Sequence, residues 1–201
     1  MAAVVYLLRH GSVVAAETGR FIGHLDVPLS ALGESQMAAV AERLRGVPLE
    51  AVYSSDLART RRSAEILAAA HGLQPHPVPA LREFAMGRWE GLTAREIRER
   101  EPGAFERWMA DVAGYRFPDG ESLGDLERRA WPAFERIMDD HPRGAVAVVA
   151  HGGTNRLIVC RALGLGPRRL LALGQDYAAL SILRRDGPRW SLDRLNEVSG
   201  T

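Results

Sequence analysis

The stretch Ala3-Val4-Val5-Tyr6-Leu7-Leu8-Arg9-His10-Gly11 begins with apolar residues and then changes abruptly to polar ones. A short apolar run that is rich in β-branched residues and ends at a glycine is typical of a strand buried on both faces. We therefore expect a buried strand over residues 3–8, followed by a tight loop that carries Arg9 and His10.

A second run of the same kind lies far along the chain, at residues 144–150, and it ends in His151-Gly152-Gly153. The remaining periodic segments divide into strands and helices by their spacing. The other expected strands are 49–55, 178–184 and 190–195, and the expected helices are 30–45, 56–70, 122–139 and 154–163. Strands that alternate with helices indicate an α/β three-layer sandwich, in which helices flank a mostly parallel central sheet.

Residues 81–120 differ from the rest, because they are rich in Glu, Arg, Trp and Phe and are interrupted by prolines and glycines. We expect a helical lid inserted within one domain that spans residues 1–201. Trp89 and Trp108 are expected to pack within this segment. Five apolar side chains there could line a pocket or pack against each other, and packing is the favoured reading: Phe84, Met86, Trp89, Phe105 and Trp108.

The composition excludes several classes of protein. The net charge is only +1, although all 26 basic residues are arginine, so a nucleic-acid partner is not expected. No apolar stretch approaches the ~20 residues of a membrane span. We expect a cytoplasmic protein with no membrane partner. The single Cys160 should be a small buried apolar residue, and His71, His76 and His141 should be exposed.

Polar groups follow three of the predicted strands. Arg9 and His10 follow the first strand, Arg59 lies one helical turn after the strand at 49–55, and His151 follows the strand at 144–150. Because ligands bind beyond the carboxyl ends of parallel strands, these side chains should converge at one edge of the sheet. Two arginines and two histidines at one place favour binding of an anion such as phosphate.

Each of these residues also has a less specific reading. A lone His10 would be an ordinary loop histidine, and Arg59 could belong to a solvated basic face with Arg61 and Arg62. The combination of four such residues at one predicted edge favours catalysis. Glu83 is weaker on the residues alone, because several surface glutamates follow it.

The sequence resembles the histidine phosphatase superfamily, which includes phosphoglycerate mutases and many phosphomonoesterases. The resemblance covers nearly the whole chain in blocks of the same order. These blocks are Leu8-Arg9-His10-Gly11, 19–30, 53–60, 81–91, Asp119-Gly120-Glu121-Ser122 and Ala150-His151-Gly152-Gly153.

The resemblance implies roles for the matching positions. His10 would be the nucleophile that becomes phosphohistidine. Arg9, Arg59 and His151 would hold the phosphoryl oxygens, and Glu83 would protonate the leaving group. These roles make physical sense, because guanidinium groups keep a nearby histidine neutral and stabilise charge on the transferring group. No metal and no cofactor is then needed.

Three further residues complete the expected phosphate site. Gly152 would open a helix whose N-terminal N–H groups face the anion. Gly23 lies in the block 19–30, next to His24, which should border the site. Ser12 stands near three departures from the family pattern, since Ser12, Val13 and Ala16 replace residues that usually include an amide. Ser12 or Thr18 is a candidate to take over that amide's contact.

The favoured function is a phosphatase that hydrolyses a small-molecule phosphate monoester through a covalent phosphohistidine. A cofactor-dependent phosphoglycerate mutase is the first alternative, but such chains are longer, and the segment 83–87 lacks the polar residues that its lid would offer. A non-catalytic domain that binds phosphorylated ligands is the second. The pattern resembles the branch with α-ribazole and phosphoserine phosphatases, whose members are often homodimers, and the sequence leaves the substrate open.

Overall fold

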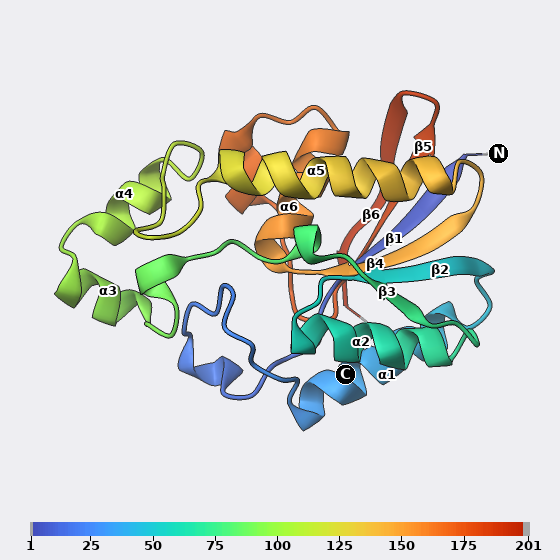
Figure 1. Ribbon diagram of the computed structural model, residues 1–201, viewed down its shortest axis with the longest axis horizontal. Coiled ribbons are helices and arrows are strands. Elements are labelled where there is room, and N and C mark those ends of the chain that lie inside the picture. Colours follow the sequence, from blue (N-terminus) through green and yellow to red (C-terminus); the bar gives the residue numbers. More distant parts are fainter. Residues whose placement is uncertain (1, 199–201) are drawn as a thin grey trace.

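A computed structural model describes residues 2–198 of the chain. It contains a six-stranded sheet in the order β3-β2-β4-β1-β5-β6 (Figure 1). The strands are β1 (Ala3–Arg9), β2 (Leu49–Ser54), β3 (Pro75–Pro77), β4 (Ala145–Ala150), β5 (Leu180–Asp186) and β6 (Arg189–Glu197). The first four strands of that order are parallel, and β5 and β6 are antiparallel to their neighbours.

Helices cover both faces of the sheet, which confirms the predicted α/β sandwich of three layers. In Figure 1, α1 and α2 lie on one side of the sheet, α5 lies on the other with α6, and α3 and α4 project at one end. The helices are α1 (Ala31–Leu44), α2 (Ala58–Ala69), α3 (Ala94–Arg100), α4 (Ala104–Ala110), α5 (Leu123–Asp140) and α6 (Gly152–Ala162). Short 3₁₀ turns span Ala16–Thr18, Pro79–Leu81, Gly87–Trp89 and Pro167–Ala172.

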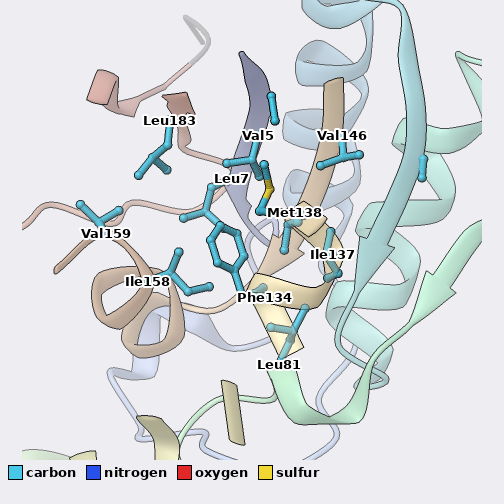
Figure 2. Close-up of a cluster of buried hydrophobic side chains, with 14 residues drawn as sticks. Val5, Leu7, Leu81, Phe134, Ile137, Met138, Val146, Ile158, Val159 and Leu183 are labelled. Atoms are coloured by element: carbon cyan, nitrogen blue, oxygen red, sulfur yellow. The ribbon is translucent and has the colours of Figure 1, made fainter. Parts of the chain in front are cut away.

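The alternation of side chains along β1 divides the core in two. Val5 and Leu7 point toward α5 and α6, where Figure 2 shows them near Phe134 and Met138. Leu8 points the other way, into the cluster formed with α1 and α2. Because both faces of β1 are buried, this strand reads as a continuous apolar run rather than an alternating one.

Two glycines allow the loop after β1 to approach α1 closely. A Cβ on Gly11 would lie 2.3 Å from the carbonyl oxygen of Gly33, and a Cβ on Gly33 would lie 2.0 Å from that of Ser12. Since no real side chain tolerates such contacts, the loop after β1 can pack on the start of α1 only with glycine at both positions.

The lid segment has its own apolar cluster, and this cluster reaches the main body of the protein. Trp89 is fully buried, and its indole packs against aromatic rings that include Phe105, Trp108 and Phe117. The same cluster includes Leu157 and Cys160 of α6. Cys160 is buried, as the sequence predicted.

Two histidines differ from expectation. His141 is half-buried, because its ring bonds to Tyr53 at 2.9 Å and to Glu50 at 2.8 Å. His71 is also half-buried, whereas His76 is exposed as predicted. Among the helices of residues 2–198, none is long and apolar enough to cross a membrane.

Candidate active site

His10 lies just beyond the end of β1 and is held there by backbone hydrogen bonds on both sides. Its N–H donates to the carbonyl of Ala150 at 3.1 Å, and its own carbonyl accepts from the N–H of Ala178 at 3.0 Å. The side chain is 3% exposed. Its Nδ1 lies 2.8 Å from the carbonyl oxygen of Gly11, which can only accept, so Nδ1 carries the proton. The lone pair of the neutral ring is therefore on Nε2.

The surroundings keep this imidazole uncharged. Burial lowers the pKa of His10 well below its ordinary value, and the positive charges of Arg9 and Arg59 lower the pKa further. The hydrogen bond to Gly11 acts in the opposite direction and is outweighed. A neutral ring with a free Nε2 lone pair is the form that a histidine nucleophile requires.

His151 lies at the end of β4, with its ring centroid 5.2 Å from that of His10. Its Nε2 lies 2.8 Å from the hydroxyl of Ser55, and its buried Nδ1 has no hydrogen-bond partner within residues 2–198. Burial lowers the pKa of His151 well below its ordinary value, and Arg59 lowers it further. A buried polar atom without a partner calls for an explanation, and here it lies on the ring next to that of His10.

Arg59 on α2 is a buried cation. Its guanidinium donates to the carbonyls of Gly23 and Leu25, both at 2.7 Å, and its Nε has no partner within the described part of the chain. Burial lowers the pKa of Arg59, whereas the charge of Glu83 raises it. An arginine remains charged under such shifts, so a positive charge is fixed beside His10.

Arg9 stacks on the ring of Tyr177, 4.0 Å from its centroid, and donates to the carbonyl of Gln175. The Tyr177 ring also lies 5.5 Å from the ring of His10. Sequence reasoning gave Tyr177 no role. Tyr177 directly precedes Ala178, whose N–H donates to the carbonyl of His10. That contact follows from the antiparallel pairing of β5 with β1, which the sequence alone does not reveal.

Glu83 accepts hydrogen bonds at the N-terminus of α6. Its carboxylate accepts from the N–H groups of Gly153 at 2.9 Å and Thr154 at 3.2 Å. A Cβ on Gly153 would lie 2.4 Å from Oε1 of Glu83. The absence of a side chain at the second residue of α6 therefore allows the carboxyl group to reach its position.

A cavity of about 170 Å³ joins most of the predicted residues. Its lining includes Arg9, His10, Gly23, Arg59 and Glu83. Its other lining residues were not singled out as site residues by the sequence: Arg20, Phe21, Ile22, Met86 and Tyr177.

Ser12 and Thr18 do not line that cavity. Ser12 packs against the start of α1, where its N–H donates to Gln36 and its carbonyl accepts from Ser30. The Thr18 hydroxyl donates to the carbonyl of Ala15. Ser12 is thus part of the contact between the loop and α1, whereas Tyr177 lines the cavity.

A second cavity of about 180 Å³ adjoins the first and shares Arg9, Phe21, Glu83 and Met86 with it. Its other walls are mostly apolar and come from the lid, from α6 and from the turn after α6. They are Phe84, Trp108, Val112, Phe117, Gly152, Gly153, Arg156, Leu170 and Leu171. The favoured reading of the lid side chains was thus only partly right: Trp89 and Phe105 pack, but Phe84, Met86 and Trp108 also line a cavity.

No three His, Cys, Asp or Glu side chains between residues 2 and 198 come together in a group that could hold a metal ion. The polar groups that line the first cavity include the imidazole of His10, the guanidinium groups of three arginines and the carboxyl group of Glu83, and the ring of His151 lies beside that of His10.

Comparison with known proteins agrees with this arrangement. Residues 5–198 match the histidine phosphatase superfamily (branch 1). Phosphoserine phosphatase 1 of Hydrogenobacter thermophilus is 30% identical over 190 residues, which cover 94% of this chain and 90% of that protein. A probable phosphoglycerate mutase, GpmB, of Yersinia enterocolitica is 33% identical over 163 residues, covering 81% of this chain and 76% of that protein.

A solved structure shows the same fold. Mycobacterial glucosyl-3-phosphoglycerate phosphatase in complex with VO3 superimposes with a TM-score of 0.87 at 33% identity, covering 96% of this chain and 98% of that one. The family match, the named relatives and the solved structure all indicate the same family. The chain belongs to the histidine phosphatase superfamily (branch 1) and is a small-molecule phosphatase.

Proposed function

We propose that this phosphatase hydrolyses a phosphate monoester in two steps, with His10 as the covalent nucleophile and Glu83 as the proton carrier. The observation that supports it most is the hydrogen bond from Nδ1 of His10 to Gly11, which leaves the Nε2 lone pair free beside two guanidinium groups. No other imidazole of the site combines a free lone pair with a place in the wall of the first cavity.

In the first step, Nε2 of His10 attacks phosphorus while the bond to the ester oxygen breaks. The electron pair of that bond leaves with the alcohol oxygen, which takes a proton from the carboxylic acid form of Glu83. Arg9 and Arg59 neutralise charge on the phosphoryl oxygens. If Nε2 of His151 accepts from Ser55, its Nδ1 carries a proton and is a third donor to those oxygens.

In the second step, water attacks phosphorus and gives its proton to the Glu83 carboxylate. The bond between phosphorus and Nε2 breaks, and its electron pair returns to the ring. The products are the alcohol and inorganic phosphate, and the enzyme recovers its starting protonation. Because arginines provide the positive charge, the proposed reaction needs no metal ion and no cofactor.

Hydrolysis is favoured over mutase activity by the second cavity. A mutase must bind a sugar acid bisphosphate in two orientations and so needs polar groups for a second phosphoryl group, whereas this cavity is walled mainly by apolar side chains such as Phe84, Trp108 and Phe117. A cytoplasmic location, a homodimer and the lack of nucleic-acid or membrane partners stay predictions from the sequence.

The test is the intact mass of the protein after rapid quenching with phenyl phosphate. The wild type should gain the mass of one phosphoryl group, the adduct should be lost on acid treatment, and His10→Ala should show none. Hydrolysis of ester without any adduct would contradict the covalent role of His10. Binding without either adduct or turnover would favour a domain that only binds phosphorylated ligands.

A further inference from the structure

The second cavity contains one charged side chain that the mechanism above does not use. Arg156 lies on α6, one helical turn after Gly152, and it lines the second cavity but not the first. It is half-buried. Its Nε donates to the carbonyl of Leu173 at 2.8 Å, which fixes the orientation of the guanidinium plane.

The terminal nitrogens of Arg156 are free to bind a ligand. Within residues 2–198, neither Nη1 nor Nη2 forms a hydrogen bond, and the side chain has no ion-pair partner within 4.0 Å. The Glu83 carboxylate is the anion of the same cavity wall, but its oxygens accept from the N-terminus of α6. Arg156 therefore presents terminal nitrogens without hydrogen-bond partners to a mostly apolar cavity, with the charges of Glu83 and Asp176 nearby.

A second guanidinium reinforces this positive charge. The Cβ position of Gly152 lies 3.2 Å from Nη1 of Arg156 and 3.6 Å from Nε of Arg9, so the two side chains meet above this glycine. Burial lowers the pKa of Arg156, Glu83 raises it and Arg9 lowers it, yet an arginine stays charged. Two like charges together in a poorly solvated place favour an anion as ligand.

The position of Glu83 between the two cavities indicates which part of the substrate each cavity holds. Glu83 lies in the wall of both, and a proton donor to the leaving group must lie between the phosphoryl group and the departing alcohol. With the phosphoryl group beside His10, the alcohol occupies the second cavity. Its volume of about 180 Å³ suits a small ring or a branched chain rather than a large conjugate.

We propose that the substrate is the phosphate ester of a small, largely apolar alcohol that bears a carboxylate, and that Arg156 binds this carboxylate. The inference rests on the proposed function, because it takes the second cavity as the leaving-group site. Phe84, Trp108 and Phe117 contact the apolar part, and the planar guanidinium pairs with both carboxylate oxygens.

The experiment compares phenyl phosphate with 3-carboxyphenyl phosphate, at a pH where the carboxylate is ionised. The wild type should have a kcat/KM about tenfold to a hundredfold higher for the carboxylated ester, as expected for a charge-assisted hydrogen-bonded pair. Arg156→Met should lose that preference while keeping its rate with phenyl phosphate within about threefold, and Arg156→Lys should recover part of it. Arg169→Met, at an exposed arginine, is the matched control and should behave as the wild type.

Three results would overturn the proposal: no preference in the wild type, an equal fall for both esters in Arg156→Met, or a preference that survives the substitution. Binding of 3-hydroxybenzoate, measured by calorimetry, provides a readout without turnover. It should weaken about tenfold or more in Arg156→Met, whereas binding of phenol should not. If the wild type turned over neither ester but kept this difference, the proposed function would fail and the carboxylate site would stand.

Discussion

At the scale of single residues, two buried imidazoles control both the chemistry and the response to pH. Burial and the neighbouring arginines lower the pKa of both His10 and His151, so both side chains are neutral in the folded protein at neutral pH. In the unfolded chain each titrates near its ordinary value of about 6.5. The unfolded state therefore binds more protons than the folded one once the pH falls below about 6.5.

We predict that stability decreases as the pH falls through this range. Each buried histidine should contribute a loss of about 1.4 kcal/mol per pH unit below about 6.5, until the pH reaches its folded pKa. The free energy of unfolding can be measured with urea at a series of pH values. Its decrease per pH unit below about 6.5 should be smaller by about this amount in His10→Gln than in the wild type. An unchanged slope in the variant would mean that His10 is not held neutral by its surroundings.

Several residues of the site were predictable because they directly follow apolar strands. His10, Arg9 and His151 stand where strand patterns end, and parallel strands bring such ends together. Glu83 needed the family resemblance, since nothing local separates it from the glutamates that follow. Tyr177 and Arg156 could not be placed, because their neighbours come from strand pairing and from packing of the lid.

At the scale of elements, the start of α6 holds Glu83, the proposed proton carrier. The helix begins at Gly152, and the N–H groups of Gly153 and Thr154 donate to Glu83. A methyl group on Gly153 would lie 2.4 Å from Oε1 of Glu83 and 2.7 Å from the ring of Phe84. The first contact requires a shift of the Glu83 carboxyl group, and the second requires a shift of the Phe84 ring.

Gly153→Ala should therefore slow hydrolysis most for the esters whose leaving group most needs a proton. We expect kcat/KM to fall more than tenfold with an alkyl phosphate, since general acid catalysis is worth about 10²–10⁴-fold. With 4-nitrophenyl phosphate, whose leaving group needs little protonation, the fall should be less than about threefold. Gly46→Ala adds a methyl group to open space and is the control. Equal losses on both esters would argue against displacement of Glu83.

The longer helices were predictable, and the short ones of the lid were not. Ser122 and Asp125 form the capping box that marks the start of α5. In the lid, α3 and α4 are only seven residues each, too short for a helical period to separate them. The antiparallel direction of β5 and β6 likewise follows from tertiary pairing rather than from their own residues.

At the scale of the whole molecule, the lid and the sheet share one apolar network. The aromatic cluster around Trp89 includes Leu157 and Cys160 on α6, and other residues of α6 pack into the core against the sheet. Shared packing of this kind couples the two parts energetically. A single domain over residues 1–201 stays a prediction from the sequence.

We predict one unfolding transition, with the same midpoint for circular dichroism and for tryptophan fluorescence. Trp89→Ala should lower the free energy of unfolding by about 3–5 kcal/mol, because it leaves a large hole in a buried cluster. Met109→Ala, at an exposed side chain of the same lid, should change it by less than about 0.5 kcal/mol. Two separate transitions in the wild type would mean that the lid unfolds by itself.

The backbone of His10 forms hydrogen bonds to the segments on either side of it, through its N–H to Ala150 and through its carbonyl to Ala178. An amide in such a place exchanges its hydrogen with solvent only when the interior of the sheet opens, whereas amides of the exposed turn Ala16–Thr18 exchange through local motion. The ring of His10, the proposed nucleophile, is thus attached to a part of the chain that opens late. Motion that admits an ester and releases phosphate can occur around it while Nε2 stays in place.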